Sequence, residues 1–367
     1  MTLVSHSGER YSSADLRWRS DSGALLDLEF TPRLHTDRLS ARSQTMWRYR
    51  EIIPIENDAH VVTFDEGFTP LTPHIISGKA VLLKQDHLFP TGSYKDRGAA
   101  VLISHAKALG VDRVVEDSSG NAGAAIAAYC ARADIQCDIY VPEITSPAKL
   151  KQISSYGAKL HLIPGSREDT ADAALRAAEE SFYASHVWNP YFFHGTKTFA
   201  YEVWEQLNFS APDEVLIPTG NGTLLIGAHI GFSELLAAGL IDGMPRLIGV
   251  QAENCCPLFQ MWNQNLDQPP IGGNVLTQAE GIAIAAPARA KQIVDIIQST
   301  RGEVITVNEN EIRSAHEMMN RSGWFVEPTS ASAIAAATKI ELEENRIIIV
   351  PLTGHGLKSA GKQDPAA

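Results

Sequence analysis

Residues 90–98 read Pro-Thr-Gly-Ser-Tyr-Lys-Asp-Arg-Gly, which places one lysine, Lys95, in a turn of small residues. A long apolar pattern of helical period follows, so we expect a helix over residues 95–109 that ends at Gly110. A lysine that opens a helix lies beside the positive end of the helix dipole, which favours a neutral amine. A neutral lysine can attack an aldehyde and hold it as a Schiff base. An ordinary polar turn before a helix explains the same residues, so the rest of the chain has to decide.

Strand and helix patterns alternate along most of the chain, although residues 1–60 are only weakly periodic. We expect strands over residues 81–84, 113–116, 137–141, 159–163, 214–217, 246–250, 303–307 and 346–350. We expect helices over residues 121–132, 147–156, 168–182, 195–207, 222–238, 309–321 and 329–340, and a frayed tail over 361–367. This alternation is typical of parallel strands joined by crossover helices. The predicted fold class is therefore α/β, with two domains of open, mostly parallel sheets covered by helices.

The composition limits the classes of function. Of the 367 residues, 44% are hydrophobic and 7% aromatic, which is typical of a globular protein. The chain has 31 Lys and Arg against 43 Asp and Glu, so its net charge of −12 argues against general binding to nucleic acid or anionic membranes. The four cysteines lack Cys-x-x-Cys spacing, so we expect neither a disulfide framework nor a metal site. With no membrane-length apolar run and no signal-peptide core, the expected location is the cytoplasm.

Two further loops that follow predicted strands are rich in donors. Residues 118–123 read Ser-Ser-Gly-Asn-Ala-Gly, and free N–H groups at such a helix start can bind a carboxylate, with Asn121 as an added donor. A simple N-cap turn explains this loop equally well. Residues 218–223 read Pro-Thr-Gly-Asn-Gly-Thr and suit a phosphate, although they match neither the Walker nor the dinucleotide motif. Taken alone, this loop also fits a tight strand-to-helix turn.

A fourth loop, residues 352–356, follows the strand expected at 346–350. In it Thr353 can present a hydroxyl to a ring nitrogen, whereas His355 is assigned no role. A lysine amine, a phosphate loop, a carboxylate loop and this hydroxyl form the set that a phosphorylated pyridine aldehyde needs in order to condense with amino acids. The set points to pyridoxal 5′-phosphate as the cofactor.

In this order, the motifs resemble those of the fold type II pyridoxal-phosphate enzymes, the family of tryptophan synthase β, threonine dehydratase and threonine synthase. The chain is similar to threonine synthases in particular, over nearly its whole length. The similarity rests on Glu-Gly-Phe-Thr-Pro-Leu at residues 66–71, on residues 90–98, on residues 189–198, and on Thr-Gly-His-Gly-Leu-Lys at residues 353–358. The chain departs from the family at Phe89, where Asn is usual, in details of the phosphate loop, and in lacking an N-terminal cysteine motif.

The resemblance implies a homodimeric lyase of amino-acid biosynthesis. It would convert O-phospho-L-homoserine and water into L-threonine and phosphate by γ-elimination and β-addition. It also implies a large domain made of residues 1–90 and 195–367 and a small domain made of residues 91–194. The substrate is then a small phosphorylated amino acid.

The resemblance also implies a role for each candidate site residue. Lys95 would form the Schiff base and shuttle protons, Asn121 would bind the phenolic oxygen of the cofactor, and Thr353 would face the pyridine nitrogen, which a hydroxyl leaves unprotonated. The cofactor phosphate would be held by Gly220, Asn221, Gly222 and Thr223. The substrate carboxylate would be lined by Ser119, Gly120 and Ala122. The substrate phosphate would be contacted by Thr91, Ser93 and Asn189. Lys149 and Lys197 are further candidates, although each of these lysines could equally be a solvated residue on a helix surface.

Two other functions stay open at this stage. A threonine or serine ammonia-lyase, or another enzyme of β-elimination or β-replacement, uses the same cofactor residues but needs no second phosphate site. A non-catalytic sensor of the cofactor or a metabolite would be expected to lack the lysine or the phosphate loop, and both are present. The sequence therefore favours an enzyme of the threonine synthase type.

Overall fold

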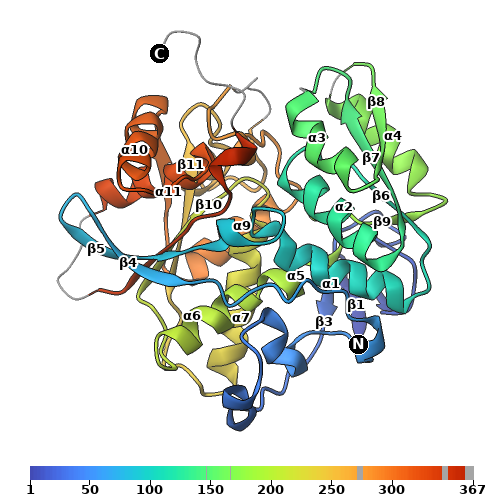
Figure 1. Cartoon of the computed structure of the whole chain (residues 1–367), viewed down its shortest axis with the longest axis horizontal. Coiled ribbons are helices and arrows are strands. Elements are labelled where there is room, and N and C mark those ends of the chain that lie inside the picture. The colour runs from blue at the N-terminus through green and yellow to red at the C-terminus, as the bar shows by residue number, and fades with distance from the viewer. Residues whose placement is uncertain (146, 166, 271–275, 341–345, 360–367) are drawn as a thin grey trace. The chain divides into compact units, whose positions relative to one another are not determined.

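A computed structural model of the chain describes residues 1–145, 147–165, 167–270, 276–340 and 346–359. The tail predicted at residues 361–367 lies outside them. The chain divides into two compact units (Figure 1). Unit 1 comprises Met1–Gly67 and Lys95–Thr196, and unit 2 comprises Phe68–Tyr94 and Lys197–Ala367.

This division differs from the expected domain boundaries, because the N-terminal segment groups with Lys95–Thr196. Val62 N donates to Ser104 Oγ of helix α1 (Lys95–Ala108) at 2.8 Å, and strand β3 (Leu26–Glu29) contacts helix α5 (Pro190–Thr196). Because the N-terminal segment is only weakly periodic, its sequence does not indicate which part of the protein it packs against.

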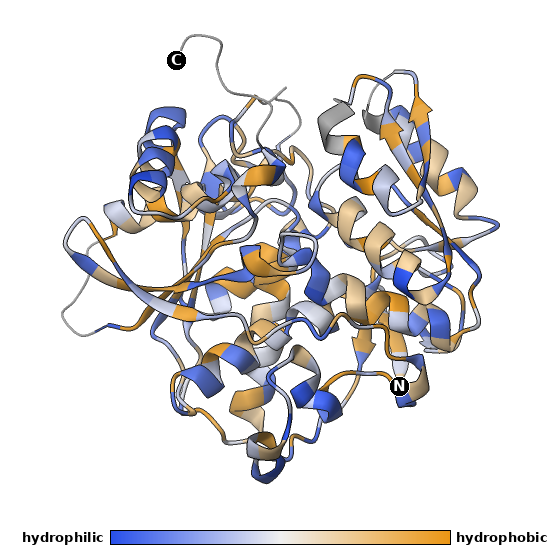
Figure 2. Cartoon of the chain, viewed as in Figure 1, coloured by the Kyte–Doolittle hydropathy of each residue, from blue (hydrophilic) through white to orange (hydrophobic). Residues whose placement is uncertain are grey.

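Unit 1 contains a parallel sheet in the order β8-β7-β6-β9 and a small antiparallel sheet in the order β2-β1-β3. The strands are β1 Thr2–Ser5, β2 Arg10–Ser12, β3 Leu26–Glu29, β6 Arg113–Glu116, β7 Gln136–Pro142, β8 Lys159–Ile163 and β9 Phe182–Tyr183. The helices are α1 Lys95–Ala108, α2 Asn121–Ala133, α3 Pro147–Ser155, α4 Arg167–Ala177 and α5 Pro190–Thr196. Helix α2 is hydrophobic along most of its length in Figure 2, which agrees with the burial of every residue from 122 to 130.

Unit 2 contains a sheet in the order β12-β11-β10-β13-β5-β4, in which β4 and β5 are antiparallel and the other neighbours are parallel. The strands are β4 Leu71–Ile76, β5 Lys79–Lys84, β10 Glu214–Pro218, β11 Arg246–Ala252, β12 Val304–Val307 and β13 Ile348–Pro351. The helices are α6 Thr198–Gln206, α7 Thr223–Ala237, α8 Pro257–Gln264, α9 Ala290–Ser299, α10 Glu309–Arg321 and α11 Pro328–Lys339. Helix α10 is largely hydrophilic in Figure 2, and its buried residues Ile312, Ala315 and Met319 recur at helical spacing.

The predicted fold class, α/β with open and mostly parallel sheets, is confirmed, but two predicted helices were wrong in their bounds. Helix α4 ends at Ala177, and Phe182 lies in β9, which pairs with β6. The helix expected over residues 195–207 is two helices, α5 and α6. A Cβ on Gly195 would collide with the Arg97 carbonyl group, so α5 packs closely on α1 before the chain turns into α6. Tertiary packing decides both differences.

Candidate active site

Lys95 is the first residue of α1, as the sequence predicted. The residues directly before it are held by the loop that follows β13, because Ser93 forms an antiparallel bridge with Gly354 and Tyr94 N donates to the Thr353 carbonyl oxygen at 3.1 Å. In unit 1, the Lys95 ammonium nitrogen lies 5.6 Å from the centre of the Phe192 ring of α5. The lysine turn is therefore fixed by backbone hydrogen bonds rather than left as a loose loop.

Residues 118–123 span the end of the connection from β6 to α2 and the first residues of α2, which begins at Asn121. A Cβ on Gly123 would collide with the Ser118 carbonyl oxygen, and Gly120 N donates to Ser118 Oγ at 3.3 Å. Gly120, which is exposed, occupies the N-cap position and has no side chain to cap the helix. Of the predicted donors, Ser119 and Asn121 are half-buried and Ala122 is buried. The loop thus leaves the first N–H groups of α2 without a side-chain cap, and their binding of a carboxylate stays a prediction.

Residues 219–222 connect β10 to α7, which begins at Thr223. Gly222 is the N-cap residue of α7 with φ of +69°, and a Cβ on it would collide with Ile293. A Cβ on Gly220 would come within 2.9 Å of Ile284 Cγ1. Thr223 is buried, and its hydroxyl lies 2.9 Å from the Tyr94 hydroxyl. Two tightly packed glycines and a hydroxyl at a helix start form the donor arrangement that suits a phosphate.

Thr353 follows β13 and is buried, and its hydroxyl has two side-chain partners. It donates to Glu327 Oε1 at 3.2 Å and lies 3.0 Å from Ser330 Oγ. Both partners stand at the start of α11, and the sequence reasoning missed them. The Glu-Pro-Thr-Ser sequence at residues 327–330 indicates a helix start, yet nothing in it identifies Thr353 as the partner.

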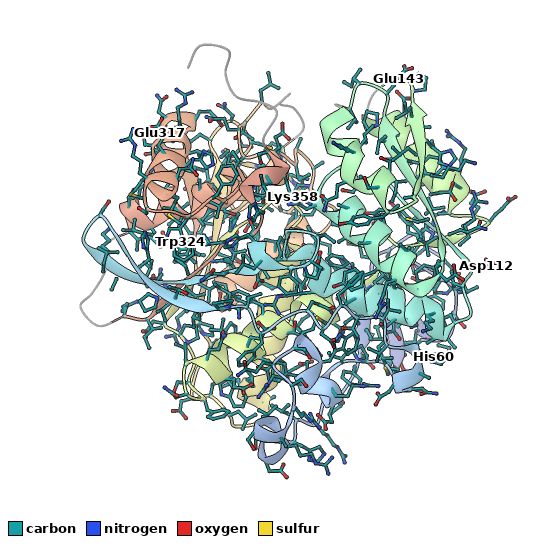
Figure 3. The ribbon with its side chains drawn as sticks, viewed as in Figure 1. His60, Asp112, Glu143, Glu317, Trp324 and Lys358 are labelled. Carbon is teal, nitrogen blue, oxygen red and sulfur yellow. The ribbon has the colours of Figure 1, made fainter. Side chains whose placement is uncertain are left out.

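The predicted contacts of the substrate phosphate differ in their surroundings. Ser93 Oγ is fully buried and has no hydrogen-bond partner among the residues that the structure describes. The Thr91 carbonyl oxygen accepts from the ammonium group of Lys358, which Figure 3 labels, at 2.8 Å. Asn189 Oδ1 accepts from Tyr191 N at 3.1 Å and so also shapes the start of α5.

Lys197 and Lys149 are the two further candidates for contacts to the substrate phosphate, and the structure describes only the first of these side chains. Lys197 is fully buried and forms an ion pair of 2.7 Å with Glu234, which also accepts from the Tyr201 hydroxyl at 2.8 Å. Burial lowers the pKa of Lys197, and the Glu234 carboxylate opposes this effect. This lysine therefore helps to pack α6 on α7 and is not a solvated helix residue, and its role as a phosphate ligand stays a prediction. Lys149 lies in α3, and its side chain is outside the described residues.

Two histidines lie beside the lysine turn, with ring centres 5.7 Å apart. Burial, and then the nearby His355, lower the pKa of His87 to about 4. His355 Nδ1 accepts from Leu357 N at 3.1 Å and therefore has a structural role in the loop of residues 353–358. His87 is neutral at neutral pH, so it adds no positive charge for a phosphorylated substrate.

The structure brings the predicted residues together in two sets. In unit 2, hydrogen bonds join the lysine turn to the phosphate loop through Tyr94 and Thr223, and to the Thr353 loop through the backbone. In unit 1, α1 with Lys95 packs on α2, which begins with Asn121, and on α5, which Asn189 precedes.

These residues fit pyridoxal phosphate. The phosphate loop offers N–H groups and a hydroxyl, Thr353 presents a buried hydroxyl, and the buried hydroxyl of Ser93 is available to a bound group. Within the described ranges, no three His, Cys, Asp or Glu side chains gather in a way that could hold a metal ion, and no helix has the length and apolarity to span a membrane.

Comparisons with known proteins show what this chain resembles in fold and in sequence. Among solved structures, a threonine deaminase of T.th. superposes with a TM-score of 0.67 at 23% identity, covering 90% of this chain and 99% of that chain. Maize serine racemase superposes with a TM-score of 0.67 at 21% identity, covering 79% of this chain and 88% of that chain. At these identities the likeness establishes the shared fold.

The sequence comparisons go further. A threonine synthase of Methanocaldococcus jannaschii is 34% identical, over 96% of this chain and 91% of that protein. A threonine synthase of Mycobacterium leprae is 34% identical, over 84% of this chain and 87% of that protein. A family model described as "Pyridoxal-phosphate dependent enzyme" matches residues 62–354. The chain therefore belongs to the family of pyridoxal-phosphate dependent enzymes, as a lyase of the threonine synthase type whose cofactor is pyridoxal 5′-phosphate.

Proposed function

We propose that this protein is a threonine synthase that converts O-phospho-L-homoserine and water into L-threonine and phosphate. The observation that carries the proposal is the similarity to threonine synthases along almost the entire chain. The geometry supports it, because the candidate loops of residues 118–123, 220–223 and 353–358 each follow a strand of a parallel sheet, where ligands of such folds bind.

The cofactor contacts are proposed residue by residue. Lys95 forms the covalent link to the cofactor aldehyde, and Asn121 hydrogen-bonds its phenolic oxygen. Thr353 faces the pyridine nitrogen. The phosphate is bound by Gly220, Asn221, Gly222 and Thr223. The tight packing around Gly220 and Gly222, and the helix start at Thr223, support the last assignment.

The substrate contacts follow from the remaining donors. Ser119, Gly120 and Ala122 at the start of α2 bind the carboxylate. The buried and unpartnered Ser93 hydroxyl, Thr91 and Asn189 are the proposed contacts of the substrate phosphate. With Lys197 engaged by Glu234, hydroxyl and amide donors account for most of this phosphate site.

Pyridoxal phosphate, when bound, supplies an electron sink that makes protons on the α and β carbons of an amino acid acidic. Lys95 accepts the proton from Cα and passes it to the substrate phosphate, which frees the amine to accept the proton from Cβ, and the electron pair of the Cγ–O bond leaves with the phosphate. Lys95 returns the Cβ proton to Cγ, accepts a proton from water as the water oxygen adds to Cβ, and gives this proton to Cα. The substrate thereby loses phosphate and gains the elements of one water molecule. One amine can serve all of these positions because the reacting carbons are consecutive.

A substrate panel on the purified holoenzyme tests the proposal. O-phospho-L-homoserine should release phosphate and L-threonine in equal amounts. O-phospho-L-serine, which has no Cγ, is the matched control and should yield no threonine. Rapid formation of 2-oxobutanoate from threonine, without phosphate release from O-phospho-L-homoserine, would identify an ammonia-lyase and contradict the proposal.

Two finer predictions, the oligomeric state and the location in the cell, are kept as proposals. The resemblance to fold type II enzymes supports a homodimer, and light scattering on the holoenzyme should then give twice the chain mass of 39.9 kDa. A single-chain mass would refute it. The cytoplasmic location rests on the sequence alone, and cell fractionation tests it.

A further inference from the structure

A tryptophan of the N-terminal segment, Trp18, packs against two aromatic rings of unit 1. Its ring centre lies 5.1 Å from that of Tyr183 at an interplanar angle of 83°, and 5.1 Å from that of Trp188 at 88°. Both are edge-to-face pairs, an arrangement that aromatic rings prefer. Trp18 therefore joins two places in the chain, one in β9 and one shortly before α5.

The first of these rings, Tyr183, is connected to the loop of residues 118–123. Tyr183 is buried and lies in β9, which pairs with β6. Its hydroxyl donates to Asp117 Oδ1 at 2.9 Å, and Asp117 directly precedes Ser118. Ser118 in turn shapes the loop, because its hydroxyl accepts from Gly120 N at 3.3 Å. A displacement of the Tyr183 ring is thus passed to the proposed carboxylate contacts.

The second ring, Trp188, directly precedes Asn189, a proposed contact of the substrate phosphate. Trp188 N donates to Ser185 Oγ at 3.4 Å, and Asn189 N donates to the Ser185 carbonyl oxygen at 3.0 Å. Asn189 Oδ1 then accepts from Tyr191 N in the first turn of α5. These hydrogen bonds make Trp188 and Asn189 parts of one turn, so the position of the Trp188 ring affects where Asn189 lies.

The segment that carries the N-terminal tryptophan is itself held by hydroxyl groups around Glu9. Its two turns share the pattern Ser-x-Ser-Gly, at residues 5–8 and at residues 20–23. Glu9 Oε2 accepts from Ser7 Oγ of the first turn and, at 2.6 Å, from Ser22 Oγ of the second. Hydrogen bonds from Ser22 and then Ser7 hold the pKa of Glu9 well below its ordinary value, so the carboxylate is charged at neutral pH. The two turns are thereby fixed to each other, which limits the movement of the residues between them.

A phosphorylated amino acid has an anionic group at each end, and their separation increases with each methylene group between them. The proposed carboxylate contacts lie at the start of α2, whereas Asn189 lies before α5. Trp18 packs against a ring connected to each of these places. Its removal would allow the two places to move independently of each other.

We propose that Trp18 is a positioning residue that sets the separation between the carboxylate contacts and Asn189, and thereby selects the chain length of the phosphorylated amino acid. The inference rests on the proposed function and deepens it, because it concerns the same substrate site.

The test measures the binding of two unreactive amino acids to the holoenzyme. L-2-amino-5-phosphonopentanoate has a methylene group in place of the ester oxygen of O-phospho-L-homoserine, so no phosphate can leave. L-2-amino-4-phosphonobutanoate is shorter by one methylene group. The change in cofactor absorbance reports the binding of each probe, and the wild-type protein should bind the longer probe more tightly.

Trp18→Leu keeps an apolar side chain but has no ring. Its affinity for the longer probe should fall about tenfold, the size expected when two edge-to-face ring pairs are lost and the loops become ordered only on binding. Its affinity for the shorter probe, which cannot reach both sets of contacts, should change little. An equal loss for both probes would mean a merely structural role for this residue and would overturn the inference.

Further variants serve as rescue, control and replacement. Trp18→Phe restores a ring and should keep most of the preference for the longer probe. Trp262→Leu in α8 removes another half-buried tryptophan with an aromatic neighbour and should change neither affinity. If Trp18→Leu does not fold, Tyr183→Phe replaces it, because this variant keeps every ring and breaks only the hydrogen bond to Asp117. It should also reduce the preference, and an unchanged preference would then overturn the inference.

The inference and the proposed function fail in different ways. If the substrate panel yields threonine and Trp18→Leu keeps the preference for the longer probe, only the inference is overturned. If the panel yields no threonine but the preference is present and depends on Trp18, only the proposed reaction is wrong. A wild-type protein without any preference would overturn the inference whatever the panel gives.

Discussion

Lys95 is expected to be dispensable for folding and indispensable for chemistry. It is a half-buried side chain at the first position of α1, so Lys95→Ala removes little packing. The variant should retain its circular dichroism spectrum and lose turnover, because no amine remains to bind the cofactor covalently or to move protons. Lys107→Ala, at the other end of the same helix, is the matched control and should keep full activity. Phosphate release by Lys95→Ala would remove this residue from the mechanism.

Tyr94 is expected to contribute to cofactor affinity through Thr223. The two hydroxyls lie 2.9 Å apart, and Tyr94→Phe removes this hydrogen bond while keeping the ring. A lost hydrogen bond of about 1 kcal/mol should raise the dissociation constant of pyridoxal phosphate about fivefold.

Titration with pyridoxal, which lacks the phosphate, is the control for this prediction. If Thr223 acts on the phosphate, Tyr94→Phe should not change the affinity for pyridoxal. Tyr140→Phe in β7, whose ring stacks on His161, should change neither affinity. An equal loss for both ligands would mean that Tyr94 acts on some other part of the cofactor.

Helix α7 offers a comparison between its two ends. Gly222 at the N-cap has φ of +69° and a tightly packed Cα, whereas Gly239, just beyond the C-cap, has φ of +68° and open space around it. Gly239→Ala should cost about 1 kcal/mol of unfolding free energy from backbone strain alone. Gly222→Ala adds a collision with Ile293 worth about 1–3 kcal/mol. Urea unfolding measures both, and equal losses would show that packing at the phosphate loop is not tight.

The elements could be predicted where the apolar period is regular, as in the helices that begin at Lys95 and Asn121. Phe182 was placed in a helix because its strand is two residues long and is defined by pairing with β6, which no local pattern reveals. In the same way, the residues around Thr353 marked it as a candidate for the site, but the importance of Glu327 follows only from its contact with Thr353, 26 residues away in the chain. A local sequence pattern predicts single helices, strands and loops. Contacts between residues far apart in the chain cannot be predicted from it.

In the whole molecule, each unit is built from two separate chain segments, and the chain passes between units at Gly67, Tyr94 and Thr196. The sequence anticipated two such bodies from the alternating strands and helices. The contacts group the N-terminal segment with Lys95–Thr196, and hydrogen bonds such as that from Val62 N to Ser104 Oγ connect residues without a shared motif.

We expect the free energy of unfolding of the whole protein to fall in acid, partly because His105 takes up a proton when the protein unfolds. Burial lowers its pKa to about 3, whereas the pKa of a histidine in the unfolded chain is about 6.5. Between these values the unfolded chain binds the extra proton, so the unfolding free energy decreases as the pH falls, by about 1.4 kcal/mol per pH unit for this group. His105→Phe preserves the stack on Tyr191 and should flatten the pH dependence of urea unfolding below about pH 6.5. An unchanged slope would show that His105 is not neutral in the folded protein.

A Cβ on Gly354 would collide with the carboxyl group of Glu327, and this collision constrains how this protein can change over generations. A side chain at position 354 is barred while the carboxylate occupies its space, so the carboxylate has to move aside or residue 327 has to shorten. Lineages that reach a larger residue at 354 therefore displace the carboxylate from Thr353. The two positions, although distant in the chain, are thus coupled, and a change at one alters what the other can hold.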